Sequence, residues 1–425
     1  MATMPLRKRP DGPQRGVRRT TERKEREMPQ EYSPFTPGQP VPVEFFVGRS
    51  SEVQEIARMV ELASTGRFSI GFLTGERGIG KSSLASFVRY FGEREHNVLG
   101  VHVFLGGVHE LPEMARRAFD RLLKESIDRP WHQKVRSFLG NHVRQVGLFG
   151  ITVEFAASSQ DLQQAVHDFA PSIKRLAETI EENRKGVFLI LDDINGLAQS
   201  EAFANWLKSL VDEIATSAQP CPFCLLLVGL EERRQTLVQH QPSLARVFRL
   251  VEITPWSDGE TRQFFEKAFA SIHVRMAPGA LQTLTTYTGG FPAVAHEIGD
   301  AVLRVDTDGY IDARDALQGV VSAADVIGRK HLEPQVYRAI RSERYRAILR
   351  KVAREPFGPQ FRRAEIMRRL PPAEKRVLDN FLNRMKRLGV VVPDAERGRG
   401  AYRFINRLHY LYFWMEAQRT QQSRV

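Results

Sequence analysis

Cysteine is nearly absent from this chain, which has only Cys221 and Cys224 among its 425 residues. Two cysteines exclude a disulfide framework and suit a reducing compartment. The pair has the Cys-x-x-Cys spacing of redox motifs, but it opens the apolar run 223–228, which favours a buried core strand. No second pair of metal ligands accompanies it, so a structural zinc site is not expected.

Hydrophobic runs of membrane-spanning length are also lacking, and so is a signal-peptide pattern. We therefore expect a cytoplasmic protein that makes no membrane contact. The hydrophobic fraction of 42% and the charged fraction of 26% are those of an ordinary globular protein. The length allows two or three domains, each with its own core.

Acidic residues are scarce at the C-terminal end. Residues 330–425 contain 23 Lys and Arg but 9 Asp and Glu, a net charge of +14, whereas residues 41–329 have a net charge of −6 and residues 1–40 of +4. A basic block that follows an acidic segment predicts a polyanion partner at the basic end. The alternative is a solvated arginine-rich surface without a partner.

The first 255 residues fall into a tail and a mixed core. Residues 1–40 lack apolar periodicity and are expected to form a disordered basic tail, with order beginning near Pro42. Beyond this point apolar strands alternate with amphipathic helices, which predicts an α/β core (41–255) whose parallel sheet has helices on both faces. Strands are expected at 68–74, 98–104, 187–191, 223–228 and 248–253, helices from Ser51, after residue 82 and around 111–125, 162–182, 201–216 and 231–238, and an inserted hairpin at 143–155.

Two further units follow the core. The pattern becomes helical after residue 253, starting at the capping signal Ser257–Glu260, and predicts a helical lid at 256–328. Residues 329–425 contain helical patterns near 343–354, 362–370 and 373–388, then strand patterns at 390–392 and 401–405. Three helices followed by a hairpin are the order of a winged-helix domain.

The strongest motif lies between the first predicted strand and the helix after it. It matches G-x-x-x-x-G-K-[ST] in full and consists of Gly75, Glu76, Arg77, Gly78, Ile79, Gly80, Lys81 and Ser82. The glycines let backbone N–H groups point at phosphate oxygens, and the helix adds the partial positive charge of its N-terminus. We expect a P-loop in which Lys81 reaches the β- and γ-phosphates of ATP, Ser82 ligates Mg²⁺, and Ser83 adds a nucleotide contact.

A second carboxylate motif completes the expected metal site. The apolar strand 187–191 ends in Asp192 and Asp193. In a parallel sheet its C-terminal end would open beside the P-loop, so that Asp192 holds Mg²⁺. Asp193, one residue later, is the candidate general base for the attacking water.

These motifs together resemble AAA+ and STAND-type P-loop ATPases of the archaeal-type, origin-recognition-like group. Residues 46–49 with Glu52 resemble the box that precedes the P-loop in this group, and Gly289–Pro292 resembles the turn of its lid. The resemblance implies a P-loop NTPase sheet, a helical lid and a C-terminal winged helix, with Gly48, Arg49 and Pro292 framing the adenine base.

The chain departs from the AAA+ pattern at two places. Most members end the acidic strand with Asp-Glu, whereas this chain has Asp192-Asp193, and the usual polar sensor after strand 223–228 is replaced by Gly229-Leu230. Both departures predict slow or partner-dependent hydrolysis. Arg246, or Arg249, is the candidate for an arginine that reaches the nucleotide of a neighbouring subunit, which implies a homo-oligomer or a nucleotide-dependent assembly; the alternative is a surface arginine without a role.

The C-terminal unit has two interpretations. As a winged helix it would contact DNA phosphates, and thus bind with low sequence specificity, through Arg376, Arg384, Arg387, Arg397 and Arg399. Asn380 and Asn383 are its only candidates for reading bases. The aromatic run from Tyr402 to Trp414 favours the alternative, in which the unit packs on the ATPase core or on a protein partner.

Two functions are consistent with the sequence. The first is an ATPase whose nucleotide state controls a DNA-contacting winged helix. The second is a nucleotide-gated protein-interaction switch, with slow or no turnover and no DNA binding.

Overall fold

A computed structural model describes residues 33–39, 46–146, 152–353, 359–405 and 407–422. The chain divides into Met1–Tyr32 and Ser33–Val425, and everything below concerns the second unit. The predicted start of order near Pro42 and most of the predicted tail lie outside the described residues. Ser33–Gln39 departs from the tail prediction, because Phe35 is buried and packs against Phe269 with a ring-centroid distance of 4.9 Å.

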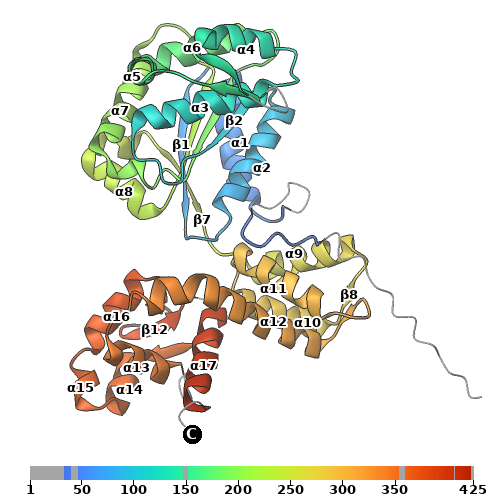
Figure 1. The fold of residues 1–425 in the computed structure, drawn as a ribbon, viewed down its shortest axis with the longest axis vertical. Coiled ribbons are helices and arrows are strands. Elements are labelled where there is room, and N and C mark those ends of the chain that lie inside the picture. Colours follow the sequence, from blue (N-terminus) through green and yellow to red (C-terminus); the bar gives the residue numbers. More distant parts are fainter. Residues whose placement is uncertain (1–32, 40–45, 147–151, 354–358, 406, 423–425) are drawn as a thin grey trace, which may run out of the picture. The chain divides into compact units, whose positions relative to one another are not determined.

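A five-stranded parallel sheet organises the N-terminal half (Figure 1). Its strands are β1 (Ser69–Gly75), β2 (Leu99–Phe104), β5 (Val187–Asp192), β6 (Phe223–Val228) and β7 (Arg249–Ile253). Their order across the sheet is β2-β5-β6-β1-β7, and all neighbours run parallel. The prediction of a parallel sheet is confirmed, with strand limits that differ by one residue or none.

Helices cover both faces of the sheet because its central strands are apolar on both sides. Leu189 and Leu191 of β5 face one core cluster, whereas Phe188 and Ile190 face the other. The first cluster is covered by α3 to α8, and on the other face of the sheet α1 and α2 cover the second. The helices of this part are α1 (Ser50–Ser64), α2 (Lys81–Glu95), α3 (Leu111–Ser126), α4 (His132–Leu139), α5 (Ser159–His167), α6 (Phe169–Ile180), α7 (Glu201–Thr216) and α8 (Glu231–His240), with short 3₁₀ turns η2 (Gly140–His142), η3 (Leu197–Gln199) and η4 (Pro242–Arg246).

Local features of this part both match and extend the predictions. Strands β3 (Val143–Val146) and β4 (Thr152–Phe155) form the predicted antiparallel hairpin. The helical pattern at 162–182 is divided into α5 and α6 at Asp168, and α4 was not predicted. Cys221 and Cys224 are buried beside and within β6, and burial raises the pKa of the Cys221 thiol to about 11, so the core-strand interpretation holds.

The segment after the sheet is helical, as predicted. It consists of α9 (Asp258–Ser271), α10 (Pro278–Thr288), α11 (Pro292–Val305) and α12 (Ala313–Ile327), plus the two-residue strands β8 (Arg275–Met276) and β9 (Tyr310–Ile311). Ser257 and Glu260 form the expected reciprocal capping box at the start of α9. The second core cluster extends from the sheet into these helices.

The C-terminal segment has a separate core cluster. Its elements are η5 (Gly328–Tyr337), α13 (Glu343–Val352), β10 (Gln360–Arg362), α14 (Arg363–Arg369), α15 (Pro372–Lys375), α16 (Leu378–Arg387), β11 (Val391–Pro393), β12 (Ala401–Phe404) and α17 (Arg407–Gln422). The expected helix 373–388 is broken at Arg376–Val377, so Lys375 and Arg376 do not belong to α16. The hairpin gains a third strand, in the order β10-β12-β11.

The aromatic run of this segment is mostly used inside it. Phe404, Tyr412 and Phe413 are buried in the segment's own core, whereas Trp414 is 36% exposed. The sequence had suggested that this run is buried against the ATPase core or against a protein partner. Tyr412, Phe413 and Trp414 lie on helix α17, which was not predicted and which also contacts α10 and α12.

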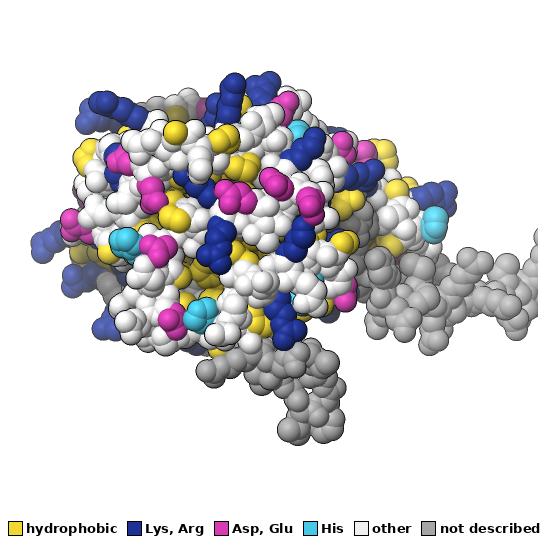
Figure 2. All heavy atoms as spheres, turned by 90° about the horizontal axis from the view of Figure 1, so that it is seen from above, with side chains coloured by type: hydrophobic (Ala, Val, Ile, Leu, Met, Phe, Trp, Pro, Cys, Tyr) yellow, Lys and Arg dark blue, Asp and Glu magenta, His cyan; other side chains and the backbone are white. Residues whose placement is uncertain are grey.

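Charges of both signs are interspersed on the face that Figure 2 presents. This mixture contrasts with the predominantly basic C-terminal segment. In the part of the chain that the structure describes, no helix is both long enough and apolar enough to cross a bilayer.

Candidate nucleotide site

The P-loop connects the end of β1 to the start of α2. Gly78 and Gly80 have φ values of 74° and 96°, a region that L side chains rarely adopt. Gly80 is the N-cap of α2, and among the described residues no side chain caps this helix. The first amides of α2 are therefore available to an anion.

Lys81 lies at the first position of α2 and turns back over the loop. Its Nζ donates to the carbonyl oxygens of Gly75 and Glu76, at 2.8 and 2.7 Å. Burial lowers the pKa of Lys81 to about 8, and the negative charges of Asp192 and Asp193 oppose this shift. Lys81 therefore lies within electrostatic range of both acids.

The two acids differ in environment. Asp192 is only 2% exposed at the C-terminal end of β5, whereas Asp193 is exposed and has a left-handed φ of 57°. The side-chain amide of Asn195 donates to the Asp193 carboxylate, and its Oδ1 accepts from the backbone N–H of Leu230 at 3.0 Å. Asn195 thus connects the acid turn to the loop after β6, where the sequence lacks a polar sensor.

A histidine that the sequence analysis did not single out contacts the buried acid. Nε2 of His102, on β2, lies 3.0 Å from Oδ2 of Asp192, and its Nδ1 lies 3.3 Å from Oγ of Ser86 on α2. His102 is the only polar side chain of the strand Leu99–Phe104. A lone buried polar group in an apolar strand needs a partner, which is the signal that could have revealed it.

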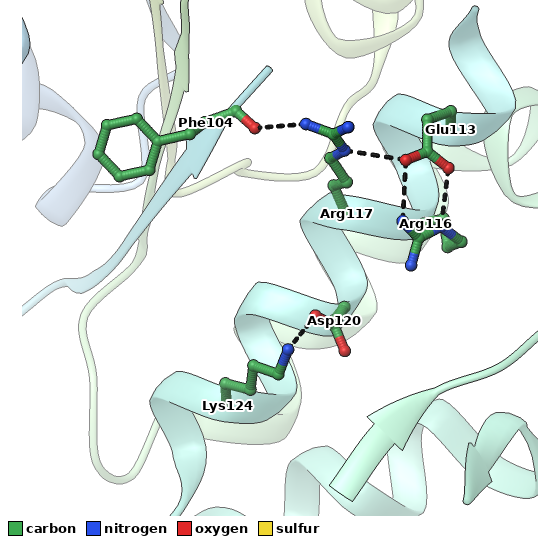
Figure 3. A network of polar contacts seen from close by, with 6 residues as sticks. All are labelled: Phe104, Glu113, Arg116, Arg117, Asp120 and Lys124. Carbon is green, nitrogen blue, oxygen red and sulfur yellow. Dashed lines mark hydrogen bonds and ion pairs between the residues drawn. The ribbon is translucent and has the colours of Figure 1, made fainter. Parts of the chain in front are cut away.

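The end of β2 is anchored by helix α3 (Figure 3). Arg117 donates to the Phe104 carbonyl oxygen at 3.1 Å, and Glu113 accepts from both Arg116 and Arg117. The hydrogen bonds from Arg116, and then those from Arg117, lower the pKa of Glu113 to about 2. The Phe104 ring stacks on His102 at 4.4 Å. This network therefore fixes the strand that carries His102.

An apolar pocket lies beside the P-loop. It is lined by Phe46, Val47, Arg49, Ile79, Gly80, Ser83, Trp256, Phe264 and Pro292. The structure thus brings five predicted contacts together: Arg49, Ile79, Gly80, Ser83 and Pro292. Trp256 and Phe264 were missed, although Trp256 directly precedes the recognised cap Ser257. The lining is apolar and aromatic, but the cavity has a volume of only about 20 Å³, which is too small for a nucleotide base.

The box before α1 makes its polar contacts within the protein. Arg49 is 6% exposed; its Nη2 donates to the Ile79 carbonyl at 3.3 Å and its Nη1 to the Thr254 carbonyl. Its backbone N–H donates to Glu260 at 3.3 Å, and a Cβ on Gly48 would lie 2.4 Å from Oε1 of the same glutamate. The box therefore joins the P-loop to the start of α9.

The lid also touches the P-loop directly. The backbone N–H of Ala293 donates to the Gly78 carbonyl at 3.2 Å, and a Cβ on Gly80 would lie 3.5 Å from Pro292. The first residues of α11 therefore lie against the loop. Glu76 and Arg77, in contrast, are exposed.

The candidate arginines near β7 are at the surface. Arg249 pairs with Glu55 at 3.2 Å. Arg246, in η4, is exposed, and within the described ranges no ion pair engages it. Arg246 is thus the more available of the two.

The residues present fit magnesium only in combination with a nucleotide. Within the described residues, no three His, Cys, Asp or Glu side chains gather into a metal site. Mg²⁺ typically takes one or two protein oxygens and completes its shell with phosphates and water. The Asp192 carboxylate near Lys81, with Ser82 next in sequence, agrees with that donor set.

A second concave site lies on the C-terminal segment and has a volume of about 580 Å³. One wall is the exposed face of α16, with Asn380, Asn383, Arg384 and Arg387; the other is the segment 338–342, which contributes Arg338 and Arg341. Among the described residues that line it, none is acidic. Of the five predicted DNA contacts, the structure brings Arg384 and Arg387 to this cavity, whereas Arg376, Arg397 and Arg399 are exposed elsewhere on the segment.

Comparisons with known proteins agree with the fold. Residues 46–226 match the family model described as AAA ATPase domain. The chain is similar to ORC2 of Aeropyrum pernix in its ADPNP–ADP complexes, with a TM-score of 0.57 and 15% identity, covering 93% of this chain and 97% of that chain. It is also similar to a Walker-type ATPase of Pyrococcus abyssi, with a TM-score of 0.54 and 17% identity, covering 87% of this chain and 96% of that one.

A search of the curated proteins found no match. At these identities the solved structures establish the fold alone. The chain therefore has the fold of the P-loop NTPases, and its residues 46–226 match an AAA ATPase domain.

Proposed function

We propose that this protein binds and hydrolyses ATP with Mg²⁺, and that its nucleotide state controls a C-terminal winged-helix domain which contacts DNA. The corresponding domains are the core (41–255), the lid (256–328) and the winged helix (329–425). The observation that carries the proposal is the electrostatic interaction of Lys81 with Asp192 beside the uncapped start of α2.

The triphosphate would be held by the loop and its lysine. Backbone amides of residues 75–82 and the Lys81 ammonium neutralise the β- and γ-phosphates. Because Lys81 now donates to two loop carbonyls, the phosphate oxygens replace these acceptors when nucleotide binds. Ser82 and Asp192 are the residues that would hold Mg²⁺, which when bound neutralises phosphate charge.

Hydrolysis would depend on Asp193. Its carboxylate accepts a proton from the attacking water, and the hydrogen bond from Asn195 orients it. In an oligomer of this chain, Arg246 of one subunit would approach the phosphates bound by its neighbour. The exposure of Arg246 supports this assignment.

The nucleotide base would occupy the apolar pocket between the box, the P-loop and the lid, and this pocket would have to widen from its volume of about 20 Å³ to admit a base. Helix α11 touches Gly78, and Arg49 donates hydrogen bonds to the carbonyls of Ile79 and Thr254. A base bound in this pocket would therefore contact the core and the lid at the same time. A ligand shifts a conformational equilibrium only through such differential contacts. The angle of the lid is thus the expected output of the nucleotide state.

DNA contact is supported by the cavity on α16. Arginines on both of its walls, without an acidic neighbour in the lining, are suited to phosphates, and the Asn380 and Asn383 amides can reach base edges. The burial of the aromatic run inside the segment removes one argument for a protein partner.

Measuring ATP turnover of the full chain with and without duplex DNA tests the proposal. We expect slow turnover that DNA changes, and DNA binding that weakens steeply with salt. Nucleotide binding without any DNA binding would instead favour the nucleotide-gated protein-interaction switch. Absence of nucleotide binding would contradict both functions.

A further inference from the structure

His102 and Asp192 are neighbours because of the strand order. β2 pairs with β5 in parallel, with Phe104 opposite Asp192 and His102 opposite Ile190. Side chains alternate between the faces of a strand, so His102 lies on the face of Phe104 and diagonally from Asp192. The contact of 3.0 Å between Nε2 and Oδ2 follows from this register.

Both groups are almost completely removed from water. The side chains of His102 and Asp192 are each 3% exposed. A buried carboxylate needs a donor, and an ionised carboxylate only accepts, so Nε2 of His102 is the donor. In the neutral ring Nδ1 then accepts, and the Ser86 hydroxyl donates to it at 3.3 Å. The carboxylate of Asp192 therefore sets the tautomer, and the Ser86 hydroxyl, which can donate or accept, matches it by donating to Nδ1.

This chain of contacts returns to the P-loop helix. Ser86 lies four residues after Ser82 on α2, so the two hydroxyls are on the same side of the helix. The Ser86–His102–Asp192 chain thus joins α2, β2 and β5. The anchoring of Phe104 by Arg117 keeps the end of β2 in place (Figure 3).

We propose that His102 is a positioning residue which holds Oδ2 of Asp192 and so leaves its other carboxylate oxygen for Mg²⁺. The inference rests on the proposed function, because that function assigns Asp192 to Mg²⁺ and the inference assigns His102 as the residue that orients Asp192. Residues that orient a metal-ligating side chain contribute strongly to metal affinity, and their replacement commonly weakens it by about 10- to 100-fold. His102 itself touches neither nucleotide nor metal in this account.

The test measures the Mg²⁺ requirement of nucleotide binding in the full chain. A fluorescent ATP analogue is titrated at increasing Mg²⁺, and in EDTA, for the wild type, His102→Phe and His102→Gln. Phe removes the donor and should raise the Mg²⁺ concentration for half-maximal tightening about tenfold or more, with binding in EDTA unchanged. Gln places an amide near the position of Nε2 and should restore a requirement within about threefold of the wild type.

A matched control separates positioning from packing. His296, in α11, is also buried, and it lies away from the acids. His296→Phe should lower stability without moving the Mg²⁺ requirement. If His102→Phe does not fold, His102→Asn takes its place, because its shorter amide lies near Nδ1 and cannot reach Asp192.

Three outcomes decide the inference. A raised Mg²⁺ requirement in the Phe or Asn variant, rescued in the Gln variant, supports it. A requirement equal to that of the wild type in a folded Phe or Asn variant overturns it and leaves the proposed function standing. Nucleotide binding by the wild type that does not respond to Mg²⁺ overturns both, because Asp192 then holds no metal.

Discussion

Nη2 of Arg49 donates a hydrogen bond to the carbonyl oxygen of Ile79 at 3.3 Å, so a residue that precedes α1 is bonded to the backbone of the P-loop. The same guanidinium reaches the Thr254 carbonyl, where the sheet passes into the lid. The sequence had placed Arg49 against the adenine. Its side chain lines the apolar pocket, and its donors are directed at protein carbonyls.

Arg49→Ala should therefore destabilise the protein. The substitution removes the guanidinium that donates to the carbonyl oxygens of Ile79 and Thr254, and the loss of these buried hydrogen bonds should lower the free energy of unfolding by about 2–4 kcal/mol. Urea unfolding of the apo protein measures the loss, and Arg49→Lys should recover part of it. Unchanged stability combined with lost ATP affinity would show that Arg49 acts on the nucleotide alone.

Asp193→Asn should separate binding from turnover. The amide keeps the size of the side chain but accepts no proton, so ATP affinity should stay the same while turnover falls about 10²- to 10⁴-fold. Single-turnover hydrolysis and nucleotide titration measure the two effects. Asp308→Asn changes an exposed aspartate far along the chain and should alter neither. Full activity of Asp193→Asn would remove Asp193 from its role.

Acidification should loosen the contact between Ser33–Gln39 and the lid. Nδ1 of His296 accepts from the backbone N–H of Thr36 at 3.0 Å, which requires an unprotonated Nδ1. Burial lowers the pKa of His296 to about 4, whereas an unfolded histidine has a pKa near 6.5. Between these values the unfolded state binds the extra proton, so stability is full above about pH 6.5 and falls as the pH drops toward 4.

The expected loss between about pH 7 and about pH 5 is about 2 kcal/mol from this one group. Denaturant unfolding at several pH values measures it. His296→Gln should flatten this part of the pH profile, and His240→Gln, at an exposed histidine, should leave it unchanged. An identical profile in His296→Gln would contradict the assignment.

The P-loop, the acidic strand and the order of elements were readable from the sequence because they depend on local pattern. The P-loop motif Gly75–Ser82 and the apolar strand before Asp192 can each be recognised from a few consecutive residues. A lone polar residue in the apolar strand 99–104 indicates that His102 has a partner, but the identity of that partner depends on the strand order β2-β5. The role of Trp256 likewise depends on the docking of the lid. The break before α16 was missed because 373–388 keeps helical periodicity across Arg376–Val377.

Reversing the charge of Arg376, Arg384 and Arg387 to Glu should eliminate DNA retention at low salt. Each lost phosphate contact lowers the slope of log affinity against log salt by about 0.9. Fluorescence anisotropy with a labelled duplex gives both quantities. The charge-matched variant Arg58→Glu, Arg67→Glu and Arg314→Glu changes exposed arginines outside the C-terminal segment and should bind DNA nearly as the wild type does. An equal loss of DNA affinity in the two variants would show that DNA binding depends on the net charge of the chain and not on these three arginines.

The central claim is that Lys81 and the amides of the curled loop neutralise a triphosphate. Calorimetric titration of the wild type and Lys81→Ala with ATP and Mg²⁺ tests it most directly. We predict saturable binding by the wild type and a loss of about a hundredfold or more in affinity for the folded variant, because one charged donor is removed from a partly buried phosphate site. An unchanged affinity for Lys81→Ala would contradict the account.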